Sequence, residues 1–266
     1  MVGLTLGLVL NAVLSKEDMA TWGWRVPFAV GAVLGLVALW IRSSMAESEV
    51  FEEHRAAEAR AGERTPIFLE VARQWRTGLL VIGMTAGLTV AYYIWSVTMP
   101  SIAQSAFGYS ADQAFTASLI GNGVFVLALP LWGALSDRIG RRVCAIAGLL
   151  GSALLDFPMT WLIEGGHDTW RLIIAICVHL VLLAGFLSHA PAMYAEMFPT
   201  AQRTAGFGIP YAIAIALFGG TAGYVLTWLG DPHAFAVYSI VLLVISSATI
   251  FFLPETKGRD LSGVEG

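Results

Sequence analysis

Long apolar runs alternate with short polar segments along nearly the whole chain. A membrane-spanning helix needs about 20 mostly apolar residues, and seven runs approach or exceed that length: residues 24–41, 77–99, 113–135, 143–163, 170–194, 204–228 and 234–253. Each run is too long for a strand and lacks strict alternation. Hydrocarbon also requires each backbone amide to be bonded within its own segment. The pattern therefore predicts an all-α integral membrane protein with seven spanning helices.

Residues 2–14 are apolar as well, but 13 residues are too few to span a bilayer. Because no Lys or Arg precedes them, they do not resemble a secretory signal peptide. The simplest interpretation is the end of a helix whose beginning is missing from this sequence.

The last six runs form a weak internal repeat. Runs that begin at 77, 113 and 143 are followed by runs that begin at 170, 204 and 234, with offsets of 93, 91 and 91 residues. Because each triplet has an odd number of helices, the second triplet is inverted relative to the first, which is typical of one six-helix half of a transporter. The predicted domains are an N-terminal remnant (1–43), a linker (44–76), a six-helix bundle (77–254) and a tail (255–266).

The distribution of Lys and Arg predicts the orientation. Six lie in 42–76, three lie in 136–142, and Arg203, Lys257 and Arg259 fall on the same side, whereas the other side has only Lys16, Arg25 and Arg171. Since cytoplasmic loops are enriched in these residues, the linker 44–76 and the C-terminus are predicted to be cytoplasmic.

Composition narrows the class of protein. The chain is 57% hydrophobic and 13% charged, with a net charge of −4, so its expected partner is the lipid bilayer and not nucleic acid. The two cysteines, Cys144 and Cys177, lie in apolar runs and suggest neither a metal site nor a disulfide framework. We find no catalytic constellation and no nucleotide-binding loop of the G-x-x-x-x-G-K-[ST] type. The sequence therefore predicts no enzyme and no cofactor, and any transport would be driven by an ion or solute gradient.

A dense polar cluster separates two of the runs, in the order Gly133, Asp137, Arg138, Gly140, Arg141, Arg142. It predicts a short loop over 136–142. Asp137 follows a helix C-terminus, where the dipole disfavours an anion, so it needs a cationic partner. Glu196, Arg203 and Glu255 are predicted to lie at the same face. Each alone is an ordinary polar helix end, but together they suggest a conformational latch or gate.

Polar groups inside the runs are further candidates. Asp156, His179 and His189 could carry a proton. The alternatives are a solvated vestibule for Asp156 and neutral histidines that donate to backbone carbonyls. Candidates for a substrate-lining role are Tyr92, Tyr93, Trp95, Asn122 and Tyr211. The alternatives here are an interfacial aromatic belt and, for Asn122, helix packing.

Several segments together carry a family resemblance: residues 22–28 (W-G-W-R-V-P-F), the 133–142 cluster, residues 195–200 (A-E-M-F-P-T) with Arg203, and Phe218-Gly219-Gly220. With these landmarks the chain resembles the metabolite:proton symporter family of the major facilitator superfamily. The resemblance implies a twelve-helix transporter of the cell (inner or plasma) membrane, of which this chain holds the end of helix five and helices six to twelve.

The same resemblance implies alternating-access symport of protons with a small organic acid. The expected substrate is alpha-ketoglutarate or a related dicarboxylate, with shikimate, citrate and proline or betaine as alternatives. A nonfunctional truncated product is a further alternative. Because no Lys or Arg lies deep within the last six runs, the countercharge for an anion is expected in the missing N-terminal half.

Overall fold

The computed structural model describes residues 2–44, 74–198 and 203–253, which belong to two units with their boundary near residue 70. The first unit contains α1 (Val2–Val13), α2 (Lys16–Asp18), the π-helical η1 (Met19–Gly23) and α3 (Arg25–Ser44). The helical stretch from Lys16 to Ser43 is long and apolar enough to span a membrane, whereas α1 is too short.

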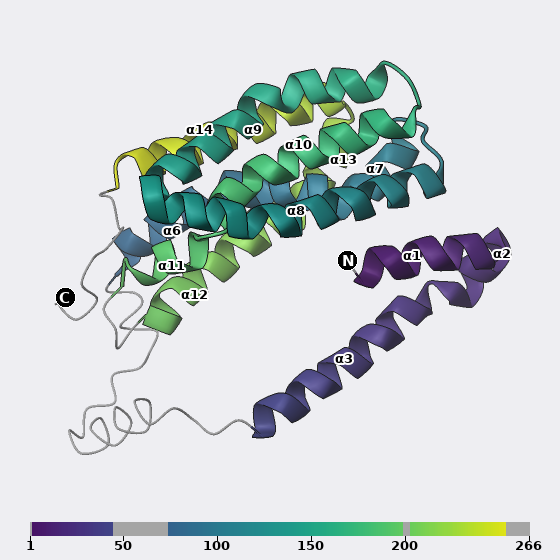
Figure 1. The fold of residues 1–266 in the computed structure, drawn as a ribbon, viewed down its shortest axis with the longest axis horizontal. Coiled ribbons are helices and arrows are strands. Elements are labelled where there is room, and N and C mark those ends of the chain that lie inside the picture. The colour runs from purple at the N-terminus through teal and green to yellow at the C-terminus, as the bar shows by residue number, and fades with distance from the viewer. Residues whose placement is uncertain (1, 45–73, 199–202, 254–266) are drawn as a thin grey trace. The chain divides into compact units, whose positions relative to one another are not determined.

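The second unit contains the remaining described helices (Figure 1). In chain order they are α6 (Trp75–Tyr92), the π-helical η2 (Tyr93–Thr98), α7 (Met99–Ser105), α8 (Ala111–Ile139), α9 (Arg141–Glu164), α10 (Thr169–Leu187), α11 (Ala190–Ala195), α12 (Arg203–Ala214), the π-helical η4 (Ile215–Gly219), α13 (Gly220–Leu229) and α14 (Pro232–Phe251).

Seven helical stretches in the described residues could cross a membrane, six of them in this second unit. Each coincides with a predicted run within a few residues at most ends, and the described residues contain no strand. The prediction of an all-α membrane protein with seven spans is therefore confirmed. Most of the predicted linker 44–76 and the tail 255–266 lie outside the described residues.

Two predicted loops are shorter in the structure because the helices continue into them. In the segment 136–142, α8 runs to Ile139 and α9 starts at Arg141, so Gly140 alone separates the two helices. Gly140 has a φ of 106°, which residues with a Cβ rarely adopt. The segment 100–112, which separates the predicted runs 77–99 and 113–135, is likewise partly helical, since α7 ends at Ser105.

Local sequence signals explain where other helices begin and end. Ser110 and Gln113 form a reciprocal capping box at the start of α8, with N···O distances of 3.2 and 3.0 Å. Asp231 accepts from the N–H groups of His233 and Ala234, both at 3.1 Å, and so caps α14.

Small residues bring the helices of the bundle close together. In the second unit α10 packs against α8 and α9, and α14 packs against α6 and α9. At the α6–α14 seam, a Cβ on Gly87 would collide with the backbone at Leu242. The Gly87 N–H donates to Ser246 Oγ at 2.9 Å, and that hydroxyl donates to Gly83 O at 2.7 Å. The seam therefore requires the Gly83-x-x-x-Gly87 spacing.

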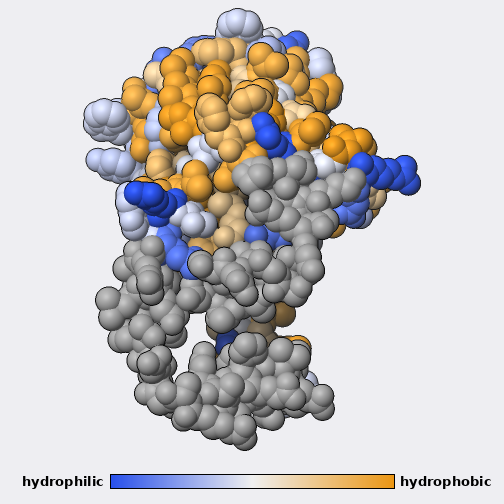
Figure 2. Space-filling view, turned by 90° about the vertical axis from the view of Figure 1, so that its left-hand side faces the viewer, coloured by the Kyte–Doolittle hydropathy of each residue, from blue (hydrophilic) through white to orange (hydrophobic). Residues whose placement is uncertain are grey.

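The surface of the bundle suits a lipid environment. In Figure 2 the described part of the visible face is mostly hydrophobic. Large apolar side chains are strongly exposed on several helices, among them Leu127, Leu131, Leu154 and Trp228. Water would disfavour such a surface, whereas lipid tails accommodate it.

Candidate functional site

A cavity of about 340 Å³, here called the tyrosine cavity, lies among five elements of the bundle. Its lining comes from α6, η2, α8, α10 and the α12–η4 segment, and consists of Leu88, Thr89, Tyr92, Tyr93, Phe125, Leu129, Leu187, Tyr211 and Ile215. Three of the five predicted substrate-lining residues thus line one cavity: Tyr92, Tyr93 and Tyr211.

The aromatic rings of this cavity touch one another edge to face or tilted. The Tyr92 ring centroid lies 6.4 Å from that of Tyr93 and 5.7 Å from that of Phe125. Tyr211 lies 5.7 Å from Tyr194, whose hydroxyl is 2.8 Å from that of Thr85. The cavity therefore combines apolar ring faces with phenol groups that can donate and accept hydrogen bonds.

The other two predicted lining residues lie elsewhere. Trp95 is buried and stacks on His179, with ring centroids 3.7 Å apart. Asn122 is also buried: it accepts from Ser96 Oγ at 2.7 Å and donates to Ser118 O at 2.9 Å. The bond with Ser96 joins α8 to η2, so Asn122 has the helix-packing arrangement that was the alternative interpretation.

Several lining residues escaped the sequence analysis because they are apolar or ordinary helix residues. Leu88 and Thr89 are four residues before Tyr92 and Tyr93, so helical periodicity places them on the same face. That spacing was a usable signal. Phe125, Leu129, Leu187 and Ile215 come from other helices, and their place in the cavity depends on tertiary packing.

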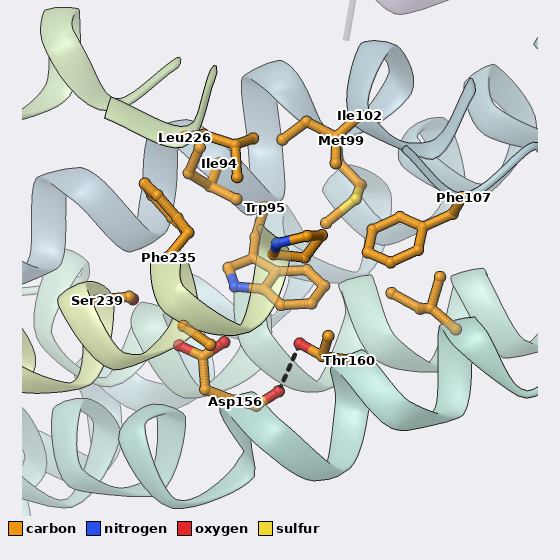
Figure 3. A pocket seen from close by; sticks show the side chains of 13 residues that line it. Ile94, Trp95, Met99, Ile102, Phe107, Asp156, Thr160, Leu226, Phe235 and Ser239 are labelled. Atoms are coloured by element: carbon orange, nitrogen blue, oxygen red, sulfur yellow. Dashed lines mark hydrogen bonds between the residues drawn. The ribbon is translucent and has the colours of Figure 1, made fainter. Parts of the chain in front are cut away.

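A second, smaller cavity of about 30 Å³, here called the aspartate cavity, surrounds Asp156 (Figure 3). Its walls come from η2, α7, α9, α13 and α14 and are apolar except for Asp156, Thr160 and Ser239 and the indole N–H of Trp95. Asp156 is 3% exposed, and its Oδ2 has no hydrogen-bond partner among the described residues. No residue lines both cavities, yet Tyr93 of η2 lines one and Ile94 and Trp95 of η2 line the other.

The three predicted proton carriers do not come together. His179 is fully buried on α10, where its Nδ1 lies 3.1 Å from Ala175 O, the bond expected of a neutral packing histidine. His189 lies between α10 and α11, with Nδ1 3.2 Å from Ser188 Oγ. Of these three residues, Asp156 alone lines one of the two cavities, the aspartate cavity.

At the α8–α9 junction, an ion pair joins the polar cluster to Glu196, one of the residues predicted to lie at the same face. Arg141 binds Glu196, which is nearly buried, so the junction is tied to the end of α11. Asp137 is exposed. The Arg142 guanidinium lies 4.7 Å from the Phe251 ring centroid. The side chain of Arg203 and the whole of Glu255 lie outside the described part of the chain.

The glycines of this cluster also differ from each other. Gly140 provides the turn between the helices, as its positive φ requires. Gly133 lies within α8, and an added Cβ there would meet no atom within 4 Å. Gly133 therefore makes no close helix contact within the described part of this bundle. Among the described residues, no three His, Cys, Asp or Glu side chains gather as metal ligands would.

The fold and the tyrosine cavity define a multi-pass membrane protein with an internal space of solute size. Comparison with protein families matches the Major Facilitator Superfamily over residues 87–266, about two-thirds of the chain. The chain belongs to this superfamily, as the sequence resemblance predicted.

Individual relatives agree with this assignment. Alpha-ketoglutarate permease of Escherichia coli (strain K12) is 30% identical, covering 98% of this chain and 60% of the relative. Shikimate transporter of the same organism is 28% identical, covering 96% of this chain and 60% of the relative. Citrate-proton symporter of Salmonella typhi is 29% identical, covering 86% of this chain and 52% of the relative. The chain thus spans about 60% or less of these relatives and matches their C-terminal part.

Proposed function

We propose that this chain supplies the C-terminal bundle of a proton-coupled symporter for a small organic acid, of the alpha-ketoglutarate or related dicarboxylate class. The tyrosine cavity carries this proposal. Its volume of about 340 Å³ falls at the lower end of the range of ligand pockets, about 300–1,000 Å³. The printed names of the relatives support organic acids as substrates of similar proteins.

The chemistry of the lining suits one part of an organic acid. The phenol hydroxyls of Tyr92, Tyr93 and Tyr211 can donate hydrogen bonds to carboxylate oxygens, and Phe125 and Leu129 can cover the carbon chain. The described lining residues include no Lys, Arg or His. A dianion needs a positive partner in low dielectric, so we propose that this charge comes from an N-terminal bundle across the cavity.

In this proposal the solute binds between two six-helix bundles and reaches each side in turn by alternating access. The Lys and Arg distribution supports an orientation in the cell membrane with the α8–α9 junction facing the cytoplasm. At that face the Arg141–Glu196 pair links two helix ends. We propose that it and Asp137 belong to a latch that holds one closed state.

One observation favours a second class of solute. A cavity lined by three tyrosines and a phenylalanine, without a cation, is suited to a quaternary ammonium group, which aromatic faces attract. A Proline/betaine transporter of Salmonella typhimurium is 29% identical over 98% of this chain. Betaine would bind its ammonium group against these rings and would need no large countercharge in this bundle.

The test is uptake into proteoliposomes by the protein expressed with all in-frame sequence upstream of Met1. Labelled alpha-ketoglutarate, shikimate, citrate and betaine are compared with and without an imposed proton gradient. We expect alpha-ketoglutarate to accumulate only with the gradient and excess unlabelled dicarboxylate to block it. Accumulation of betaine but no organic acid would overturn the organic-acid proposal in favour of the second class. Equal uptake with and without the gradient would overturn proton coupling.

A further inference from the structure

We propose that the aspartate cavity is a separate proton-binding site of this bundle, with the proton held on the Asp156 carboxyl group beside the Ser239 hydroxyl. This inference rests on the proposed symport only for its role in transport. The site itself is argued from the contacts around Asp156.

Two buried polar groups in this cavity neighbour each other. Neither Asp156 Oδ2 nor Ser239 Oγ makes a hydrogen bond of regular geometry among the described residues, the Ser239 side chain is the group that interacts with the Asp156 carboxyl group, and the two residues are 3% and 2% exposed. Figure 3 shows the Asp156 carboxyl group directed toward α14, the helix that carries Ser239. Thr160 does not serve the carboxyl group, because its hydroxyl donates to the backbone oxygen of Asp156 at 2.9 Å. Groups this deeply buried are normally satisfied, by protein or by water.

The surroundings provide no cation for an ionised carboxylate. Asp156 is the one titratable side chain among the residues that line the cavity. On the elements packed around it, His179 of α10 lies behind the Trp95 ring and Tyr238 of α14 neighbours Ser239. Glu164 and His233 pair with each other at 3.1 Å, at the end of α9 and the start of α14. An unpaired buried carboxylate is strongly disfavoured, and such a group normally takes up a proton instead.

The volume of the aspartate cavity restricts which ligands it can hold. A volume of about 30 Å³ admits one or two water molecules and no organic acid. A metal cation would need several oxygen ligands, whereas the lining side chains offer only Asp156, Ser239 and Thr160, and Thr160 already donates elsewhere. A protonated Asp156 carboxyl group has one O–H to donate and oxygens that accept, so it can share hydrogen bonds with the Ser239 hydroxyl or with a water in this cavity.

The site is connected to the tyrosine cavity through η2. Tyr93 and Trp95 are two residues apart in this π-helical turn, and they line the tyrosine and aspartate cavities respectively. π-Helical turns are irregular and recur at functional sites. A shift of η2 on solute binding would change the space around Asp156, so solute binding and proton binding would be linked reciprocally.

The test is infrared spectroscopy of the purified full-length protein, which detects the carbonyl band of a protonated carboxyl group without any transport. We expect such a band near neutral pH, sensitive to deuterium oxide and shifted by ¹³C-carboxyl labelling of aspartate. It should be lost in Asp156→Asn and kept in Asp112→Asn, a matched change of an exposed aspartate on α8. Ser239→Ala should shift the band in a folded protein with the carboxyl group intact.

Three outcomes would overturn the proposal: no aspartate band in the wild type, an unchanged band in Asp156→Asn, or no shift in Ser239→Ala. If Asp156→Asn does not fold, the labelled wild type and Ser239→Ala decide alone. Loss of the band when sodium chloride replaces choline chloride would assign the cavity to a metal cation instead. Because the band needs no solute, a failed uptake assay would refute the proposed function and leave this result standing. The shift expected on adding alpha-ketoglutarate tests the link through η2.

Discussion

The tyrosine cavity and the aspartate cavity share the π-helical segment η2 but differ in every other respect. The first has a volume of about 340 Å³ and is lined by rings with hydroxyl groups from helices far apart in the chain. The second has a volume of about 30 Å³ and surrounds one carboxyl group. The difference agrees with the proposed division of roles, in which size and aromatic surface suit an organic solute, whereas small volume and a lone carboxyl group suit a proton.

The largest effect is expected from Trp95→Ala, which removes a wall of the aspartate cavity. Trp95 is 4% exposed and stacked on His179, and truncating a buried Trp costs about 3–5 kcal/mol. We expect a large drop in the thermal unfolding temperature of the purified protein. Trp228→Ala, at a residue 73% exposed on α13, is the matched control with little expected change. Equal unfolding temperatures of the two variants would contradict the buried position of Trp95 in the cavity wall.

The next largest effect is expected at the contact between α6, which lines the tyrosine cavity, and α14, which lines the aspartate cavity. A side chain in Gly87→Val would push α14 away from α6, since a Cβ already collides with the α14 backbone. Overpacking of this kind costs about 1–3 kcal/mol, and we expect reduced thermal stability. Gly223→Val is the control, because no atom lies within 4 Å of a Cβ there. If both variants unfolded at the wild-type temperature, the close α6–α14 contact would be refuted.

A smaller effect should separate the roles of the two cavities. Tyr92→Phe and Tyr211→Phe each remove one hydroxyl from the tyrosine cavity, and a lost hydrogen bond costs about 0.5–1.5 kcal/mol, or about 2- to 10-fold in affinity. We expect weaker solute binding, measured by competition for uptake, with an unchanged carboxyl infrared band. Tyr224→Phe, exposed on α13, should bind as the wild type does. Altered binding in that control alone would place the solute elsewhere.

The smallest effect at neutral pH concerns Tyr109, in the loop between α7 and α8. Its hydroxyl donates to Gly166 O at 2.7 Å and to Ile163 O at 3.1 Å. Burial raises the pKa of Tyr109 above its usual value, and Asp168 adds to this while Arg171 opposes it.

A raised pKa means that the stability contributed by neutral Tyr109 is complete below the unfolded value, about 10, and is lost as pH rises through the folded value. The unfolding temperature should therefore decline only at alkaline pH, and Tyr109→Phe should remove that part of the decline. A Tyr109→Phe profile that matched the wild type at alkaline pH would refute this assignment. Titration of the aspartate cavity would remain as a separate event.

Comparison of individual residues shows where sequence reasoning reached its limit. The spanning segments were predicted well, and the tyrosines at 92, 93 and 211 do share a cavity. Trp95 was grouped with Tyr92 and Tyr93 but lines the other cavity. Residues two apart on a helix do not face each other, so Trp95 points away from Tyr93, and only the tertiary structure shows that a second cavity lies on that side.

The same limit applies to the polar cluster. The run of glycines and arginines correctly indicated a tight junction, because charged residues between two spans must lie at a membrane face. The ion pair at this junction, however, joins Arg141 to Glu196, which is 55 residues away. The choice among several arginines depends on how α9 and α11 are placed.

By itself, the sequence determined that this protein is helical, crosses the membrane with seven segments and belongs to a superfamily of transporters. These properties follow from the length and composition of each segment. Each spanning segment must by itself be long and apolar enough to cross the bilayer, and it must form its own backbone hydrogen bonds. Only the tertiary structure decided which polar groups meet: Tyr211 with Tyr92 and Tyr93 in one cavity, and Ser239 with Asp156 in the other. The physical reason is that these meetings depend on the rotation and contact of whole helices, set by glycine seams and π-helical turns.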